Sequence, residues 1–431
     1  MVSCKKNDMK KIAVVGTGIA GLASAWILSQ KYEVTLYEKN DYVGGHTNTR
    51  AATFGDKTVY ADTGFMVFNN KTYPHLMKMF EYLDIQSVKT DMAFGITVGG
   101  GQFEFSSDNV FVQPLNFFRP KYWKMLSDIV RFNHHAVDVV EKHSHEFPLK
   151  ELMKELSLGT MFQEKYLLPM AGAIWSTDKS NILDYPAKQF VTFFDNHGLL
   201  YPKRWNPLTL HRGRLQWYTV KNGAQEYVKK ILADMQADVR LSCGVRRVSR
   251  SEDTVVVEDE RGDILTYDTI VFASHPNQTL AMLADSSEAE KSILGSFVYT
   301  PNDTYMHQDP SYMLTGTSTW PSWTYAEPAE GATELTYNMN RLQSIDQDTP
   351  VYVTLNPHKK PHKDNTFYQT VYEHPRFSLD TLDAQEQLHT IQGVHSTWFA
   401  GAWTGHGFHE DGLRSALRVV EALHVSPPWE V

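Results

Sequence analysis

The sequence predicts an α/β fold in which two domains are interleaved along the chain. Its 431 residues are too many for one ordinary core and too few for three. Alternating strand and helix patterns open the chain, return after residue 223 and close it after residue 398. An aromatic-rich stretch and a further run of strands lie between them. We therefore expect one segmented domain around a parallel sheet, and a second, α+β domain with a mixed sheet flanked by helices.

The first predicted elements form one βαβ unit. Lys11–Val15 is a short apolar strand, apolar residues recur at helical spacing from Ile19 to Ile27, and Val34–Tyr37 is apolar again. A further helical pattern covers Tyr73–Leu83. A βαβ unit joins parallel strands through a crossover helix, as in a doubly wound sheet.

The rest of the chain alternates between the two expected domains. Aromatic residues are frequent from about 110 to 215, where helices are predicted near 121–141 and 150–170. The later elements are a helix from Gly223, strands near 239–249, 253–258, 268–273, 334–338, 351–355 and 398–400, and a helix over 412–423. The expected domains are residues 1–100 with 216–290 and 392–431, and residues 101–215 with 291–391.

Composition argues against several classes of protein. With 41 basic and 50 acidic residues the net charge is −9, which disfavours a nucleic-acid binder and favours a small-molecule ligand. The two cysteines, Cys4 and Cys243, form neither a zinc pattern nor a disulfide framework, so we expect no metal and a reducing cytoplasm. We expect no signal peptide and, without an 18-residue apolar run, no transmembrane segment. Peripheral contact with the inner membrane surface stays open.

A glycine-rich turn joins the first strand to the first helix and reads Gly16-Thr17-Gly18-Ile19-Ala20-Gly21. In this pattern Gly16 permits the tight turn, Gly18 lets the backbone approach a pyrophosphate, and Gly21 lets helix and strand pack closely. Glu38 ends the second strand, where a carboxylate can accept the hydrogen bonds of an adenosine ribose and disfavours the 2′-phosphate of NADP. The first domain is therefore expected to be a Rossmann-type dinucleotide-binding domain.

Two further segments decide between NAD and FAD, which share that turn. They are Gly44-Gly45-His46-Thr47-Asn48-Thr49 and Asp62-Thr63-Gly64-Phe65. Together with the turn and Glu38, they resemble the FAD-dependent amine oxidase superfamily, which includes monoamine oxidases, protoporphyrinogen oxidases and phytoene desaturases. The resemblance implies bound FAD, with the glycines, His46 and Thr47 near its ribityl and pyrophosphate groups. Because no suitable cysteine attachment motif lies near the flavin end, we expect the FAD to be bound without a covalent bond. His46 replaces the usual arginine, and an imidazole is a shorter donor that is only sometimes charged.

The resemblance extends to the adenosine side and to the C-terminus. It implies that the main chain of Val245 reads the adenine edges and that Ala273 ends the strand covering the adenosine. Phe399–Leu413 is similar to the closing motif of the superfamily, in which a helix N-terminus faces the flavin edge that becomes negative on reduction. Gly412 and Leu413 are the expected amide donors. The other implied cofactor contacts are Ile19, Ala20, Lys39, Thr63, Gly64, Phe65, Gly401, Ala402, which stands where relatives carry an acid, Trp403 and Asp411.

Two histidines are candidates for the chemistry. His406 and His409 flank the closing turn, and either could act as an acid or base or hold the substrate. Glu410 and Asp411 also fit a plain capping role at the start of the helix. No second GxGxxG turn is present, so we expect no built-in NADPH domain, and the substrate would give a hydride to flavin N5.

Three functions stay open at this point. GGHTNT and GHGFHEDG resemble, more narrowly, bacterial flavoproteins associated with cyclopropane fatty acid synthases. That resemblance implies an enzyme that oxidises, desaturates or isomerises a lipid acyl chain, with a synthase-type partner. The second function is an amine oxidase, in which Trp403 and Phe408 build an aromatic cage around a small amine. The third is a non-catalytic flavin-binding partner of a lipid-modifying enzyme.

Aromatic side chains in or beside the second expected domain suit an apolar tunnel, whose inner end would be residues 403–409. They are Trp175, Trp205, Trp217, Trp320, Trp323 and Tyr325. Residues 117–126 mix aromatic and cationic side chains, as interfacial segments of membrane-bound enzymes do. A solvated helix with a buried stripe would give the same pattern.

Overall fold

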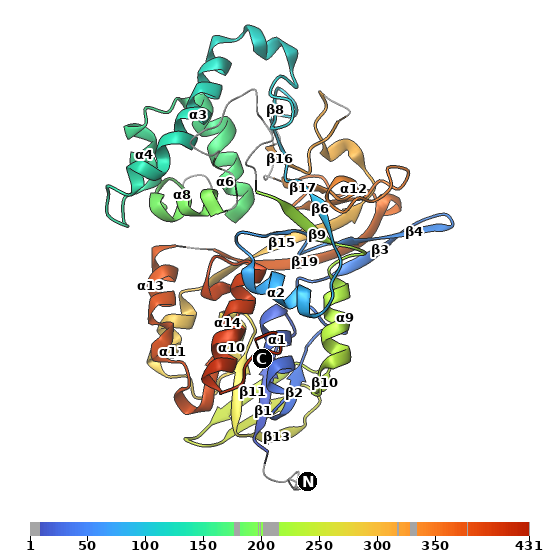
Figure 1. The fold of residues 1–431 in the computed structure, drawn as a ribbon, viewed down its shortest axis with the longest axis vertical. Coiled ribbons are helices and arrows are strands. Elements are labelled where there is room, and N and C mark those ends of the chain that lie inside the picture. The colour runs from blue at the N-terminus through green and yellow to red at the C-terminus, as the bar shows by residue number, and fades with distance from the viewer. Residues whose placement is uncertain are drawn as a thin grey trace.

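A computed structural model describes residues 9–175, 182–196, 198, 200, 215–316, 319–327, 334–376 and 378–430. Cys4, Trp205 and the side chain of Trp175 lie outside the described residues. Figure 1 shows a parallel sheet near the N-terminus at one end of the long axis and a group of helices at the other end. Two long strands, β15 (Val298–His307) and β19 (Thr366–Arg376), lie between them.

The first sheet has five strands, all parallel. In spatial order they are β10 (Asp238–Arg240), β2 (Glu33–Tyr37), β1 (Lys11–Val15), β14 (Thr269–Phe272) and β20 (Thr397–Phe399). The crossover helix α1 (Ile19–Leu28) is buried along its whole length. Strands that read as continuous apolar runs need cover on both faces of their sheet, and this sheet has it.

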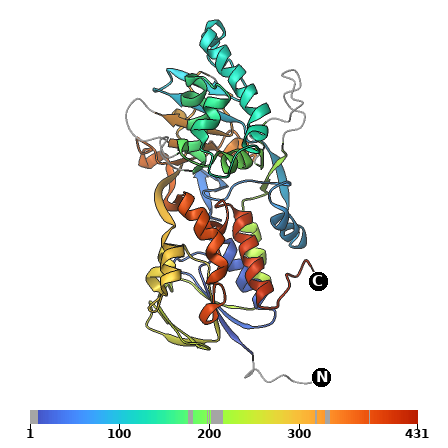
Figure 2. The ribbon, with the colours of Figure 1, turned by 90° about the vertical axis from the view of Figure 1, so that its left-hand side faces the viewer.

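Helices cover one face of the parallel sheet. With α1 they are α2 (Pro74–Tyr82), α9 (Gln225–Asp234) and α14 (His409–Ala422). Figure 2 shows α14 and α9 beside α1. On the other face lies an antiparallel sheet of β11 (Val245–Arg250), β12 (Val255–Asp259) and β13 (Ile264–Tyr267), with α10 (Pro276–Met282), α11 (Glu288–Gly295) and α13 (Leu379–Gln387) nearby. These layers confirm the α/β class with a Rossmann-type sheet.

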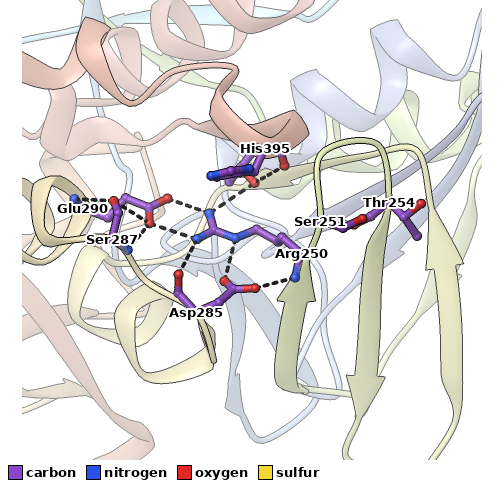
Figure 3. Close-up of polar contacts among 8 residues, drawn as sticks. Arg250, Ser251, Thr254, Asp285, Ser287, Glu290 and His395 are labelled. Carbon is purple, nitrogen blue, oxygen red and sulfur yellow. Dashed lines mark hydrogen bonds and ion pairs between the residues drawn. The ribbon is translucent and has the colours of Figure 1, made fainter.

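A buried arginine holds β11, α11 and β20 together (Figure 3). The guanidinium of Arg250 donates to both carboxylate oxygens of Glu290, at 2.6 and 2.9 Å. Its Nε donates to Asp285 at 2.8 Å, and Nη1 reaches Thr397 Oγ1 at 3.3 Å. The side chains of Arg250 and Glu290 are both almost fully buried. The ion pair therefore fixes the start of α11 against the strand that leads to the C-terminal turn.

The second large sheet has seven strands, of which one neighbouring pair is parallel. In spatial order the strands are β19, β15, β18 (Tyr352–Leu355), β17 (Glu334–Asn338), β16 (Trp323–Glu327), β7 (Phe94–Val98) and β8 (Phe103–Ser106), with β16 and β7 parallel. Helices pack on it through an aromatic-rich core: α3 (Pro120–Val140), α4 (Leu149–Glu155), α5 (Thr160–Phe162), α6 (Leu168–Trp175) and α8 (Ala187–Asn196). The predicted boundary at residue 100 falls between the paired strands β7 and β8, and the division into domains stays a prediction.

Several short elements belong to neither of the two large sheets. They are the hairpin of β3 (Thr49–Phe54) and β4 (Lys57–Asp62), the sheet of β5 (Phe68–Asn69), β9 (Trp217–Val220) and β6 (Ser87–Thr90), and helix α12 (Met339–Leu342). Within the described ranges, no helix combines the length and the apolar character needed to cross a bilayer. No three histidine, cysteine or acidic side chains in those ranges are grouped so that they could hold a metal ion.

Two predicted elements are interrupted. The helix expected over 150–170 breaks after α4, because Ser157 adopts a left-handed φ of 50° and the amide of Gly159 donates to Asp128 at 2.9 Å. The strand expected over 239–249 is β10 followed by β11. Between them Ser242 has a φ of 46°, and the amide of Cys243 donates to the carbonyl of Glu38 at 2.8 Å. In both places tertiary hydrogen bonds override a continuous local pattern.

Candidate functional site

A cavity of about 410 Å³ opens where β1, β14 and β20 end, between the parallel sheet and the seven-stranded sheet. The carboxyl ends of strands are where open α/β sheets bind ligands. Thirteen of the predicted cofactor-binding and catalytic residues line it: Gly18, Ile19, Ala20, His46, Thr63, Gly64, Phe65, Ala273, Gly401, Ala402, Trp403, His406 and His409. The other predicted site residues are not part of the lining: Gly16, Gly21, Glu38, Lys39, Gly44, Gly45, Thr47, Val245, Asp411, Gly412 and Leu413.

The glycines of the first turn and of the GGHTNT segment differ in the space that surrounds them. A Cβ at Gly21 would lie 1.8 Å from the carbonyl oxygen of Gly16, so this position has no room for a side chain. A Cβ at Gly45 would lie 3.0 Å from Cα of Gly18, because the two loops touch there. Gly18 is open instead, since a Cβ there would meet no atom within 4 Å. The chain therefore leaves free space at the one glycine that the fingerprint assigns to a pyrophosphate.

Glu38 lies just after β2, buried beside the first turn. Its Oε2 accepts from the amide of Thr17 at 3.1 Å and from the Thr17 hydroxyl, and its Oε1 accepts from the amide and the side chain of Asn40, each at 2.9 Å. Its backbone binds Cys243, which brings Val245 to the same end of the sheet. Lys39 next to it is exposed. The four donors of Thr17 and Asn40 fill the lone-pair sites of the carboxylate, so a ribose hydroxyl would bind Glu38 in place of one of them.

His46 belongs to a group of aromatic rings at the cavity wall. Its ring stacks on Tyr372 and on His374, with centroids 4.8 and 5.4 Å apart. Burial lowers the pKa of His46 to about 4, so the ring is uncharged at neutral pH. Its Nε2 is buried and has no hydrogen-bond partner among the described residues. An orphaned buried donor or acceptor at this point fits a polar group of a bound cofactor, although without the positive charge of the arginine that His46 replaces.

His409 is the first residue of α14 and is held on three sides. Its Nε2 lies 2.9 Å from Thr47 Oγ1 and 2.9 Å from the hydroxyl of Tyr227. Its ring stacks on Phe65 with centroids 3.7 Å apart. The exposed part of the ring faces the cavity, and burial lowers the pKa of His409 to about 3. His409 is therefore a neutral, fixed side chain, whereas the ring of His406 is exposed and has no hydrogen-bond partner among the described residues.

The structure corrects the expected amide donors of the closing helix. Helix α14 begins at His409, three residues before the predicted start, so the amide of Gly412 donates to the carbonyl of Phe408 at 3.1 Å. Gly412 and Leu413 thus lie inside the helix. The amides at the helix start belong to residues 409–411. Gly412 has a packing role instead, because a Cβ there would lie 2.7 Å from the Ile19 side chain of α1.

The two acids of the closing motif bind protein groups. Asp411 accepts from the amides of His406 and Phe408, at 3.0 and 3.1 Å, and so braces the turn behind the cavity. Glu410 accepts from the amides of His75 and Leu76, each at 3.0 Å, and caps helix α2. Both acids thus cap helix or turn amides, as one of the two interpretations of the sequence expected. Glu410, however, caps α2 and not α14.

Nine apolar side chains form much of the described cavity wall, and we call the part that they form its apolar end. They are Met66, Val67, Met92, Phe193, Trp217, Trp323, Leu335, Leu355 and Phe408. Trp217 and Trp323 were among the predicted aromatics, whereas Trp320 and Tyr325 do not line the cavity. Among the described lining residues the one acid is Glu373, which lies 3.3 Å from His275 Nδ1 and 3.2 Å from Gln278 of α10.

Several lining residues were not singled out from the sequence. Tyr372, Glu373 and His374 come from β19, and Phe193 comes from α8. Tyr227, which holds His409, lies in α9. No local motif marks these positions, because strand pairing and helix packing bring them to the site from distant parts of the chain.

A family model described as "Flavin containing amine oxidoreductase" matches residues 19–292. A stretch of 38 residues is 58% identical to 1-hydroxycarotenoid 3,4-desaturase of Flavobacterium sp. strain P99-3. A stretch of 39 residues is 59% identical to 4,4'-diapophytoene desaturase of Staphylococcus aureus strain Newman. Each match covers 9% of this chain and 8% of the relative, so the chain aligns with less than a tenth of these curated relatives.

Two solved structures share the fold over nearly the whole chain. The CLA-producing fatty acid isomerase from P. acnes has a TM-score of 0.67 at 12% identity, over 97% of this chain and 100% of that one. Wild-type putrescine oxidase bound to putrescine has a TM-score of 0.66 at 13% identity, over 96% and 99%. Since the family model covers well over half of the chain, the protein belongs to the flavin containing amine oxidoreductase family and is an FAD-dependent oxidoreductase.

Proposed function

We propose that the enzyme oxidises, desaturates or isomerises the acyl chain of a lipid, which lies at the apolar end of the cavity. The observation that carries this proposal is the set of nine apolar side chains in the described lining, which supply thioether, aliphatic and aromatic groups. Glu373, the acid in the described lining, is engaged with His275 and Gln278 near the nucleotide side. Among the described lining residues, the apolar end therefore offers a small amine no carboxylate.

We propose that FAD lies along the carboxyl ends of the parallel strands. The free space at Gly18 would take the pyrophosphate, Glu38 and the main chain at Val245 the adenosine, and Ala273 would cover it. His46 Nε2, which is buried without a partner, would meet a polar group of the cofactor. The amides of residues 409–411 at the start of α14 would face the flavin edge that becomes negative. Bound in this way, FAD supplies a hydride acceptor.

The side chains of the protein would position the acyl chain of the substrate and exclude water from it. An alkyl chain offers no charge to grip, so its recognition depends on apolar burial, worth about 0.8 kcal/mol per methylene. His409, neutral and fixed by Thr47 and Tyr227, would hold Phe65 and the closing turn in place. We propose that His406, whose ring has no described partner, takes or returns the proton that a desaturation or isomerisation requires.

The alternatives have weaker support. The fold is shared with a putrescine oxidase, but Trp403 packs on Phe297 at 4.8 Å in one hydrophobic cluster while Phe408 packs on Phe193 at 5.4 Å in another. An aromatic cage built from Trp403 and Phe408 therefore has little geometric support. The fold shared with a fatty acid isomerase and the resemblance to synthase-associated flavoproteins favour a lipid substrate. A synthase-type partner and a cytoplasmic location belong to the same proposal.

Cells that produce the protein are expected to contain altered acyl chains. Their lipid extracts, analysed by mass spectrometry, should differ in unsaturated or modified chains from extracts of cells with the empty vector. A variant with His406→Ala should retain FAD but reduce the difference about 10²-fold or more, because a general acid or base contributes that much. Lipid profiles that are the same with and without the protein would contradict the proposal.

A further inference from the structure

Four large apolar side chains stand exposed in one short segment before and at the start of α3. Leu115, Phe117, Phe118 and Trp123 are exposed by 69, 52, 78 and 47%. They come from the 3₁₀ turn Pro114–Phe118 and the first turn of α3. We call these four residues, three of which are aromatic, the aromatic patch. Apolar groups gathered in this way mark an interaction site, whereas scattered ones need no explanation.

Internal contacts hold the patch in its exposed conformation. The indole Nε1 of Trp123 donates to the carbonyl of Phe117 at 2.7 Å. Phe111 lies behind them, with ring centroids 5.5 Å from Phe117 and 5.4 Å from Trp123. Asn116, between the two exposed phenylalanines and Leu115, is fully buried. The rings are thus presented outward by an ordered turn, at the cost of leaving apolar surface in water.

Cations beside the patch give it a charge preference. Arg119 and Lys121 are exposed, and among the described residues neither has a carboxylate partner: the guanidinium of Arg119 donates to the neutral Asn116 at 3.0 Å. Lys124 differs, because it pairs with the buried Asp128 at 3.2 Å. The protein as a whole has a net charge of −9, so two cations without a described carboxylate partner beside exposed rings differ from its overall negative charge.

We propose that the aromatic patch, with Arg119 and Lys121, docks the enzyme onto an anionic lipid bilayer. Apolar rings enter the headgroup and acyl boundary while cations stay at the anionic headgroups, which is the chemistry of interfacial segments. Helix α3 lies at the end of the molecule opposite the N-terminus (Figure 1), and it packs against α8, which contributes Phe193 to the cavity. The docked face and the substrate end of the cavity therefore belong to one helical unit.

Vesicle flotation with the purified holoenzyme tests this directly. The enzyme should float with vesicles of phosphatidylglycerol and phosphatidylcholine, less with phosphatidylcholine alone, and less at high salt. The double variant Leu115→Ser/Phe118→Ser should bind at least tenfold more weakly. The Lys121→Gln variant should bind about fivefold more weakly than the wild type, and only on anionic vesicles. The matched control is Ile264→Ser on β13, which is 66% exposed far from the patch in sequence and should bind as wild type.

Equal flotation of wild type and double variant would overturn the proposal, as would failure of the wild type to float. If the wild type does not bind vesicles and sediments as a dimer, while the double variant sediments as a monomer, the patch is a contact between two copies. Bilayer docking is then wrong. Retained FAD absorbance in every variant shows that the fold is intact. The readout needs no turnover, so its failure is distinguishable from failure of the proposed lipid substrate.

Discussion

A Gly18→Val variant is expected to fold and to purify colourless, whereas the wild-type protein should carry FAD that heat releases intact. Gly18 has φ −60° and ψ 175°, a conformation open to any residue, and a Cβ there meets no atom of the protein. The valine side chain would therefore fill only the space in which we place the pyrophosphate, and flavin retention should be lost.

Gly21→Val is the matched comparison, and it should fail differently. A Cβ there would lie 1.8 Å from the Gly16 carbonyl oxygen, so α1 could not approach β1. We expect this variant to be insoluble or to unfold at a much lower temperature. Flavin content by chromatography of the released pigment and folding by circular dichroism separate the two outcomes. Full FAD occupancy in Gly18→Val would mean that the site is misplaced.

Arg250→Met should destabilise the folded protein by about 3–5 kcal/mol, because it leaves the buried carboxylate of Glu290 without its cation. The methionine keeps much of the volume but none of the donors that reach Glu290 and Asp285. Urea unfolding followed by flavin fluorescence would measure the loss. Glu288→Gln, at an exposed surface pair with Lys291 in the same helix, should change stability by less than about 0.5 kcal/mol.

The Arg250 pair also predicts a pH dependence. Burial alone would raise the pKa of Glu290, but hydrogen bonds and charge from Arg250 lower it below its ordinary value. A carboxylate with a depressed folded-state pKa adds stability above its unfolded pKa of about 4.3, and this stability is lost as the pH falls through the folded value. The difference between wild type and Arg250→Met should therefore be largest near neutral pH and shrink in acid. A pH-independent difference would contradict the ion-pair explanation.

Local patterns were sufficient for the nucleotide half of the fold. The strand Lys11–Val15 has the predicted bounds, and the crossover helix begins at Ile19 as expected, because alternating periodicity and glycine punctuation are properties of neighbouring residues. The glycine turn at residues 16–21 and the segment at residues 62–65 likewise contribute to the cavity lining. Each is a contiguous motif that can be recognised without knowledge of tertiary contacts.

Tertiary contacts set what the sequence could not predict. The closing helix starts early because Asp411 ties the turn at His406 and Phe408 while Glu410 is drawn to the start of α2, partners that no spacing rule indicates. Tyr227 meets Thr47 from 180 residues away, and β19 brings His374 beside His46. Such residues can be identified only after the sheets are assembled.

Anaerobic bleaching of the bound flavin distinguishes a lipid substrate from an amine substrate. The oxidised holoenzyme is mixed without oxygen with phospholipids bearing unsaturated or cyclopropane chains, and separately with a panel of small amines including putrescine. We expect loss of the flavin's visible absorbance, or an altered acyl product where the hydride is returned, with a lipid and not with any amine. Rapid bleaching by a soluble amine, with no change in spectrum or product from any lipid, would contradict this expectation and establish an amine oxidase instead.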